Sequence, residues 1–180
     1  MPTPTDDFKL TAFLAACCLF LSTVEFAIPK PIPFMRIGLA NIPVLLALST
    51  LPTRRLLLLI LLKVLGQATI QGSIFSYVFL FSLAGSLSSG ILMMLCSRLL
   101  GKRISLIGIS VMGALASNLT QILIAVLLLF GESGWLIAPP LLAIGLISSS
   151  LLGVFAEEFR ARSRWFKDLR PPAKTQGLSA

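Results

Sequence analysis

Long apolar runs alternate with short polar or basic segments along the chain, and this pattern predicts a bundle of membrane-spanning helices. A helix needs about 20 consecutive apolar residues to cross the hydrocarbon core. The six runs extend over about residues 8–28, 37–51, 56–70, 75–100, 104–130 and 135–155. Because the second and third runs are short for a crossing helix, we expect neighbouring polar residues to extend them or the rest of the protein to shelter them.

The first run contains Glu25 and has no cleavage-site pattern, which indicates a retained helix rather than a signal peptide. Composition agrees with a membrane protein: 56% of the 180 residues are hydrophobic and 12% are charged. Soluble domains have about a quarter charged residues, so both an ordinary soluble domain and a disordered chain are excluded. In a soluble protein the net charge of +8 would suggest a nucleic-acid partner. Here the basic residues lie mostly between the runs and in the tail, so we interpret them as topology signals and expect no nucleic acid.

The placement of Lys and Arg predicts the orientation in the membrane. Basic pairs occupy positions 54–55 and 102–103, between the second and third runs and between the fourth and fifth, and further basic residues follow residue 159. With both termini in the cytoplasm, all of these lie inside, as the positive-inside rule requires. Two exceptions, Lys30 and Arg36, follow the first run.

The predicted fold is therefore an all-α integral membrane protein: a bundle of six transmembrane helices with both termini cytoplasmic, in the cytoplasmic (inner) membrane. We expect two parts. Residues 1–158 form the six-helix substrate-binding domain, and residues 159–180 form a basic cytoplasmic tail that contacts anionic lipid headgroups.

Several polar side chains interrupt the apolar runs and need a physical reason, because an ionisable group inside a bilayer costs about 2.5–3.5 kcal/mol on insertion scales. These residues are Glu25, Lys63, Gln67, Gln71, Asn118 and Gln121. With a rise of about 1.5 Å per residue, Glu25 lies about 25 Å above the inner end of its helix, Gln67 about 16–18 Å and Asn118 about 21 Å. The polar groups of three helices therefore converge on the outer half of the bundle, beside the loop that carries Lys30 and Arg36.

Helical spacing gives these polar residues a shared face. Lys63, Gln67 and Gln71 follow one another at intervals of four, and Asn118 and Gln121 are three apart. One interpretation is structural: Glu25 pairs with a lysine, Lys30 or Lys63, and the amides join neighbouring helices. The interpretation that we favour for the whole set is a pocket that opens to the outside and binds a small anionic or zwitterionic solute.

Small residues recur at intervals of about four inside the runs, a spacing that lets helices approach closely. They are Ala12, Ala16, Ser82, Ser86, Gly90, Gly113, Ser117, Gly145 and Ser149. We interpret most of them as packing positions. Ala12 and Ala16, near the inner end of the first helix, are also candidates for docking a partner.

Chemical motifs for catalysis are missing from the sequence. It has no phosphate-binding loop of the Gly-x-x-x-x-Gly-Lys-Ser/Thr type, no acidic cluster suited to Mg²⁺ and no histidine. The three cysteines lie in apolar runs, where cysteine behaves as a small hydrophobic residue. We therefore expect no enzyme activity, no metal site and no cofactor.

Two segments carry a family resemblance: RIGLANIPVLLAL at residues 36–48, preceded by a proline-rich loop, and SNLTQ at residues 117–121. Over about residues 11–153 the chain resembles the Gx transporter family, which is related to the substrate-binding S components of energy-coupling factor (ECF) transporters. That family also carries the name heptaprenyl diphosphate synthase component I.

The resemblance implies the six-helix S-component fold, with a solute site near the outer face under the first loop. It implies that Lys30 and Arg36 steer and latch the solute, and that Gly38 lets the backbone approach it closely. It also implies a T component and a pair of ATPases as partners, and an Ala-x-x-x-Ala motif, matched by Ala12 and Ala16, that docks the T component. In this scheme the hydrogen bonds to the solute come from Asn41, Gln67, Asn118 and Gln121.

The predicted function is thus the substrate-binding subunit of an ECF-type importer, which captures a vitamin or related metabolite outside and delivers it inward. One alternative is a non-catalytic membrane component of heptaprenyl diphosphate synthase. Another is a membrane scaffold that binds no ligand. A vitamin, a flavin-like compound and an isoprenoid precursor all fit a mixed polar and apolar pocket, so the sequence leaves the solute open.

Overall fold

A computed structural model describes residues 4–29 and 37–163, leaving out the side chains of residues 4–6 and 102. Every regular element in this part of the chain is helical, which confirms the all-α prediction. The long helices are α1 (Pro4–Ala27), α3 (Thr53–Ile70), α4 (Tyr77–Leu100), α5 (Leu106–Ile124) and α6 (Ala138–Arg162). Between them lie η1 (Leu39–Asn41), α2 (Ile42–Ala47), η2 (Gly101–Arg103), the π-helical turn η3 (Ala125–Phe130) and η4 (Gly131–Ile137).

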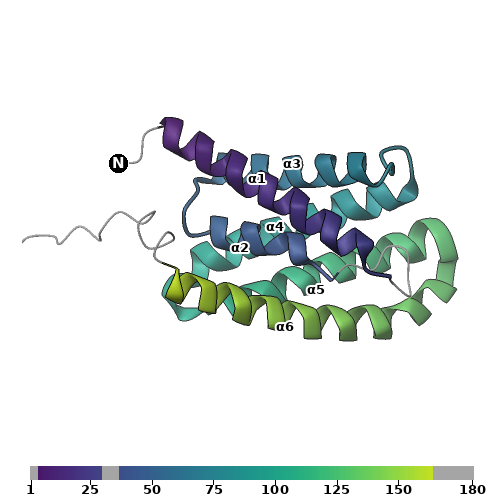
Figure 1. The fold of residues 1–180 in the computed structure, drawn as a ribbon. Coiled ribbons are helices and arrows are strands. Elements are labelled where there is room, and N and C mark those ends of the chain that lie inside the picture. Colours follow the sequence, from purple (N-terminus) through teal and green to yellow (C-terminus); the bar gives the residue numbers. More distant parts are fainter. Residues whose placement is uncertain (1–3, 30–36, 164–180) are drawn as a thin grey trace, which may run out of the picture.

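The helices form an up-and-down bundle (Figure 1). Helix α5 packs against α4 on one side and α6 on the other, and α1 packs against α3 and η1. Figure 1 shows that α1 begins and α6 ends at the same end of the bundle, on the left, where the chain also passes from α2 into α3. The turns η3 and η4 lie at the opposite end. We call the left end the basic end, because exposed arginines such as Arg54 and Arg103 lie there.

The second apolar run differs from its prediction. Instead of a long helix, residues 37–51 form the three-residue turn η1 and the six-residue helix α2. Gly38 has φ +90°, which breaks the helical backbone, and Pro43 stands in the first turn of α2. At about 1.5 Å per residue, α2 is about 9 Å long and does not cross a bilayer. The described chain therefore has five long helices, and the prediction of six is wrong at this run.

All six residues of α2 are buried, so this helix is an internal element of the bundle. It lies against α1, α3 and α6. Its side chains join a large aliphatic core in which Val44, Leu45 and Leu59 are almost completely buried. A helix that is surrounded by other helices does not need to be as long as the membrane is thick. This explains why the run is short for a membrane-crossing helix.

The outer surface of the bundle is apolar. Phe20, Phe75 and Leu136 are among many large hydrophobic side chains that are fully or mostly exposed, a surface that soluble monomers rarely have. Three helical stretches are long and apolar enough to cross a membrane: Asp7–Ala27, Tyr77–Leu100 and the continuous stretch Leu106–Arg162. These features indicate a membrane protein.

Side chains at the basic end hold the helix termini together. The Arg55 guanidinium lies 6.0 Å from the centre of the Phe8 ring. Arg98 donates a hydrogen bond to the hydroxyl of Thr53, which links the end of α4 to the start of α3. Helix α6 continues to Arg162, past the predicted start of the tail at residue 159. Residues 164–180 of that tail lie outside the described residues.

Candidate functional site

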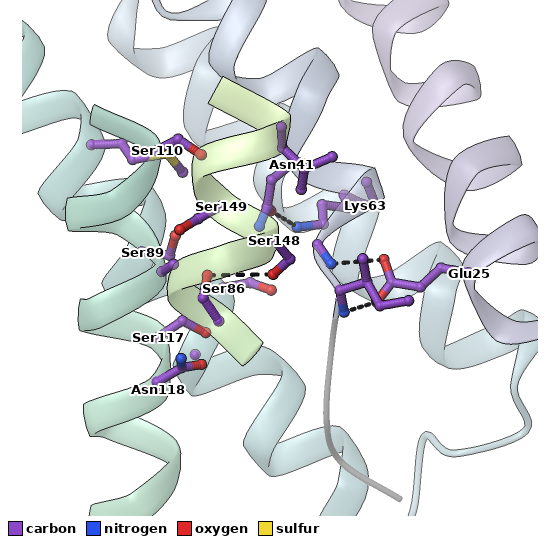
Figure 2. Close-up of a pocket in the computed structure, with 18 of the residues that line it drawn as sticks. Glu25, Asn41, Lys63, Ser86, Ser89, Ser110, Ser117, Asn118, Ser148 and Ser149 are labelled. Atoms are coloured by element: carbon purple, nitrogen blue, oxygen red, sulfur yellow. Dashed lines mark hydrogen bonds between the residues drawn. The ribbon is translucent and has the colours of Figure 1, made fainter. Parts of the chain in front are cut away.

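A narrow polar cavity lies inside the bundle, between the end of α1, η1 and helices α3 to α6 (Figure 2). Its volume of about 50 Å³ has room for about three to five water molecules. Most of the lining is polar or small. The lining residues are Glu25, Ile37, Gly38, Ala40, Asn41, Lys63, Gln67, Gly85, Ser86, Ser89, Met93, Ser110, Ala114, Ser117, Asn118, Gly145, Ser148, Ser149 and Leu152.

The polar lining divides into two walls, which lie on opposite sides in Figure 2. We call Glu25, Asn41, Lys63 and Gln67, from α1, η1 and α3, the charged wall. The other side, from α4, α5 and α6, is the hydroxyl wall. It consists of Ser86, Ser89, Ser110, Ser117, Asn118, Ser148 and Ser149.

Glu25 fixes the backbone at the start of η1. The residue is 2% exposed, and its carboxylate accepts hydrogen bonds from the N–H groups of Ile37 (2.9 Å), Gly38 (3.1 Å) and Leu39 (2.8 Å). The first N–H groups of a helical turn have no partner within the turn, and a carboxylate stabilises them through charge-assisted hydrogen bonds. Glu25 therefore anchors the segment that follows the first loop, a role that the sequence did not predict.

Two further features define the same segment, a glycine with a positive φ angle and a hydrogen bond to α1. The φ angle of +90° at Gly38 lies in the left-handed region, which glycine adopts without strain. A side chain at this position would also meet the Asn41 amide, 3.2 Å from the new Cβ. The Cys18 thiol donates a hydrogen bond to the carbonyl of Ala40 over 3.4 Å. Residues 37–41 thus form a fixed edge of the cavity.

Lys63 and Gln67 extend the charged wall along α3. Lys63 is 5% exposed, and its Nζ donates a hydrogen bond to Oδ1 of Asn41, so α3 is joined to η1. Gln67 follows one turn later, is also buried and lines the cavity. Their interval of four residues places both on the inner face, as the sequence predicted.

Amides support the hydroxyl wall from α5. Asn118 donates through Nδ2 to the carbonyl of Leu141 over 3.0 Å, which ties α5 to α6. Gln121 donates through Nε2 to Oγ of Ser117 over 3.2 Å. Glycines make room for both amides: a Cβ at Gly145 would lie 2.0 Å from Nδ2 of Asn118, and one at Gly85 would lie 2.7 Å from Nε2 of Gln121.

The serines of this wall are functional candidates that sequence reasoning missed. The spacing of small residues predicts packing positions at Ser86, Ser117 and Ser149, and it does not single out Ser89. Ser89 is 2% exposed, and its hydroxyl has no hydrogen-bond partner among the described residues. The available signal was the recurrence of hydroxyl-bearing residues at helical spacing, which a packing stripe of small residues has as well.

Other predicted site residues lie outside the cavity or outside the described part of the chain. Gln71 directly follows the last residue of α3, is partly exposed and does not line the cavity. Gln121 lies behind Ser117, and its Oε1 is buried without a partner among the described residues. Lys30 and Arg36 fall outside the described residues.

The predicted docking residues Ala12 and Ala16 are both exposed on α1. Ala16 borders a shallow apolar groove together with Phe20 and Leu21. In the described residues no three side chains of the His, Cys, Asp or Glu type form a group suited to a metal ion. All three cysteines are free thiols.

Comparison with known proteins adds one finding. The family model for heptaprenyl diphosphate synthase component I matches residues 14–159, which include every residue that lines the cavity. No curated protein and no solved structure matches the chain. The family match spans most of the sequence, and the chain therefore belongs to the heptaprenyl diphosphate synthase component I family.

Proposed function

We propose that this chain is the solute-binding membrane subunit of an ECF-type importer, an S component that captures a small solute outside and delivers it inward. The observation that carries the proposal is the polar cavity inside an otherwise apolar bundle. Burying polar and ionisable groups among membrane helices costs free energy. Where a membrane protein contains such groups, they commonly line a substrate pathway. A cavity that is lined by polar groups from α1, η1 and α3 to α6 suits a binding role.

The proposed topology has both termini in the cytoplasm. Arginines such as Arg54, Arg103 and Arg160 lie at the basic end, where positive charge favours the cytoplasmic side. Residues 37–52 return the chain to this end through η1 and the buried helix α2, so the chain passes along the bundle six times. In this orientation Glu25 and η1 lie at the outer end of the cavity, where a solute enters.

A vitamin-sized solute is larger than the cavity. Drug-sized ligands occupy pockets of about 300–1,000 Å³, whereas this cavity has a volume of about 50 Å³. Binding of such a solute therefore requires the two walls to separate. We expect the charged wall to move as a unit, with residues 37–41 still bound to Glu25 and Lys63. The reason is that α3 packs less extensively against α4 than α5 packs against α4 and α6.

Transport by this chain needs energy-coupling partners, which we propose are a T component and a pair of ATPases. The exposed Ala12 and Ala16, beside the apolar groove at Phe20, supply a surface on α1 where the helix of a T component packs closely. The basic tail after residue 163 is proposed to contact anionic lipid headgroups.

Medium depletion tests the proposal. Cells that lack this chain are compared with cells that express the wild type, Lys63→Met or the control Glu132→Gln, whose side chain is exposed on η4. We expect at least one solute to leave the medium only with the wild type and the control, and the wild type to retain ATPase subunits on purification. Identical depletion profiles, together with no retained ATPase, contradict the importer.

A second candidate follows from the family description: a non-catalytic membrane component of heptaprenyl diphosphate synthase. Under this proposal the chain anchors a soluble catalytic partner, and the cavity binds no transported solute. Prenyl-chain elongation is measured with the catalytic partner alone and with this chain added. A severalfold rise in elongation that survives Lys63→Met, with no solute depletion, supports this candidate over the importer.

A further inference from the structure

The two walls of the cavity differ in the ligand chemistry that they suit. On the charged wall, Glu25 and Lys63 carry opposite charges, and both bind groups of η1. On the hydroxyl wall, the described lining residues carry no formal charge. The hydroxyl wall is therefore an uncharged hydrogen-bonding surface.

The hydroxyl wall combines donors and acceptors. Ser117 accepts a hydrogen bond from Gln121, which leaves its O–H to donate. Ser148 and Ser149 donate to carbonyls of their own helix, at Gly145 (3.3 Å) and Leu146 (3.1 Å), which leaves their oxygen lone pairs to accept. A ligand hydroxyl both donates and accepts and thus matches this mixture. A carboxylate only accepts and an ammonium only donates, so neither matches it.

The hydroxyl of Ser89 indicates a site for a hydrogen-bonding ligand in the cavity. Its hydroxyl lines the cavity, is 2% exposed and has no hydrogen-bond partner among the described residues. A buried hydroxyl without a hydrogen-bond partner is destabilising, and a ligand hydroxyl in the cavity would remove this cost. Ser82, on the same helix, is equally buried and also lacks a partner there, but it does not line the cavity. The two serines form a matched pair for experiment.

The residues on this side of the cavity disfavour the binding of planar ring systems. Gly85, Ala114 and Gly145 lie between the serines, and no Phe, Tyr or Trp is present among the described lining residues. Binding sites for planar ligands commonly include an aromatic side chain that stacks on the ring. A narrow space bordered by small residues and hydroxyls suits an extended chain instead.

We propose that the hydroxyl wall binds an uncharged, aliphatic, hydroxyl-bearing part of the solute, such as a polyol chain. This inference rests on the proposed solute-binding function and narrows its substrate class. A four-carbon polyol has four hydroxyl groups, about as many hydrogen-bonding groups as the water molecules, about three to five, for which the cavity has room. Its carbon chain needs further space, which separation of the two walls would supply.

The test uses two probes that differ only in their inner hydroxyls, erythritol and 1,4-butanediol. The full-length protein in lipid nanodiscs is examined by saturation-transfer NMR with each probe, and empty nanodiscs give the background. We expect at least threefold stronger transfer to erythritol. Ser89→Ala should reduce the erythritol signal severalfold, and Ser82→Ala should leave it unchanged. Ser149→Ala gives a second test of the wall if Ser89→Ala does not fold.

Equal transfer to the two probes overturns the inference, as does an equal effect of Ser82→Ala and Ser89→Ala. The binding assay involves no transport partner, so its result is independent of the importer proposal. Solute depletion without a preference for erythritol refutes the polyol inference alone. A Ser89-dependent preference without any solute depletion refutes the importer alone.

Discussion

The charged wall and the hydroxyl wall surround the same cavity but are built on different physical principles. On the charged wall, Glu25 and Lys63 bind a short irregular segment, residues 37–41, to two long helices. On the hydroxyl wall, small residues let α4, α5 and α6 pack closely, and their hydroxyls and amides bond mostly to groups of the wall itself.

This difference shows how a membrane bundle holds an irregular backbone. The N–H groups at the start of η1 would be costly to bury without partners, and the Glu25 carboxylate supplies the acceptors. The regular helices of the hydroxyl wall satisfy their own backbone, so serines and glycines are enough there. We therefore expect changes on the charged wall to act through hydrogen bonding and changes on the hydroxyl wall to act mainly through packing.

The largest effect is expected from Glu25→Ala, which removes the acceptor for three N–H groups. Breaking a buried charged interaction of this kind costs about 3–5 kcal/mol. The measurement is the free energy of unfolding from denaturant titration followed by tryptophan fluorescence. Glu25→Gln, which keeps one acceptor oxygen, should lose about half as much, and the exposed control Glu132→Ala should lose nothing measurable. Equal stability of Glu25→Ala and wild type would remove the anchoring role.

A smaller loss is expected from Gly153→Ala, which breaks the close packing of the hydroxyl-wall helices. The new Cβ would lie 2.6 Å from the backbone Cα of Ile107, so α6 must shift away from α5. Overpacking of this kind costs about 1–3 kcal/mol. Ala143→Val, at an exposed position of the same helix, is the control and should change the unfolding free energy little. Alanine has a higher helix propensity than glycine, so a loss in Gly153→Ala must come from packing. Unchanged or increased stability of this variant would contradict close packing of α5 and α6 at Gly153.

Ser82→Ala should stabilise the protein by about 1 kcal/mol, because it removes a buried hydroxyl that has no partner among the described residues. The shift of the melting temperature in detergent shows whether the substitution stabilises or destabilises the protein. Ser22→Ala, equally buried and lacking a partner in the same way, should have the same effect. A clear loss of stability in both variants would mean that these hydroxyls form hydrogen bonds in the membrane.

Lys63→Met separates stability from function. Removing an ammonium from the membrane interior saves about 2.5–3.5 kcal/mol, and losing its hydrogen bond to Asn41 costs about 1.5–3 kcal/mol. The two effects nearly cancel, so we expect the unfolding free energy to change by about 1 kcal/mol or less. Solute depletion should nevertheless fall at least tenfold. A large stability loss with unchanged depletion would assign Lys63 to the fold alone.

Periodicity was a reliable guide where the helices are regular. The interval of four between Lys63 and Gln67 predicts one inner face, and both side chains are buried against the cavity. A buried position for Asn118 follows in the same way. Gln71, at the next interval, leaves the cavity because α3 ends there.

Periodicity failed where the backbone is irregular or where one pattern serves two purposes. Residues 37–51 are apolar enough for a membrane helix, but Gly38 and Pro43 shorten the helical part to α2, and its burial explains the apolar sequence. The serines of the hydroxyl wall have the spacing of a packing stripe, so their position at a cavity was not evident from spacing.

The amino-acid sequence by itself determined that this chain is helical, apolar on its outside and polar at a few interior positions, because composition and helical repeat depend only on neighbouring residues. The tertiary structure alone decided what those polar positions do. It directed Glu25 to a backbone fourteen residues away, buried α2 among other helices and left Ser89 facing a cavity. Such roles depend on which distant segments meet, and contacts between distant segments are not encoded in local periodicity.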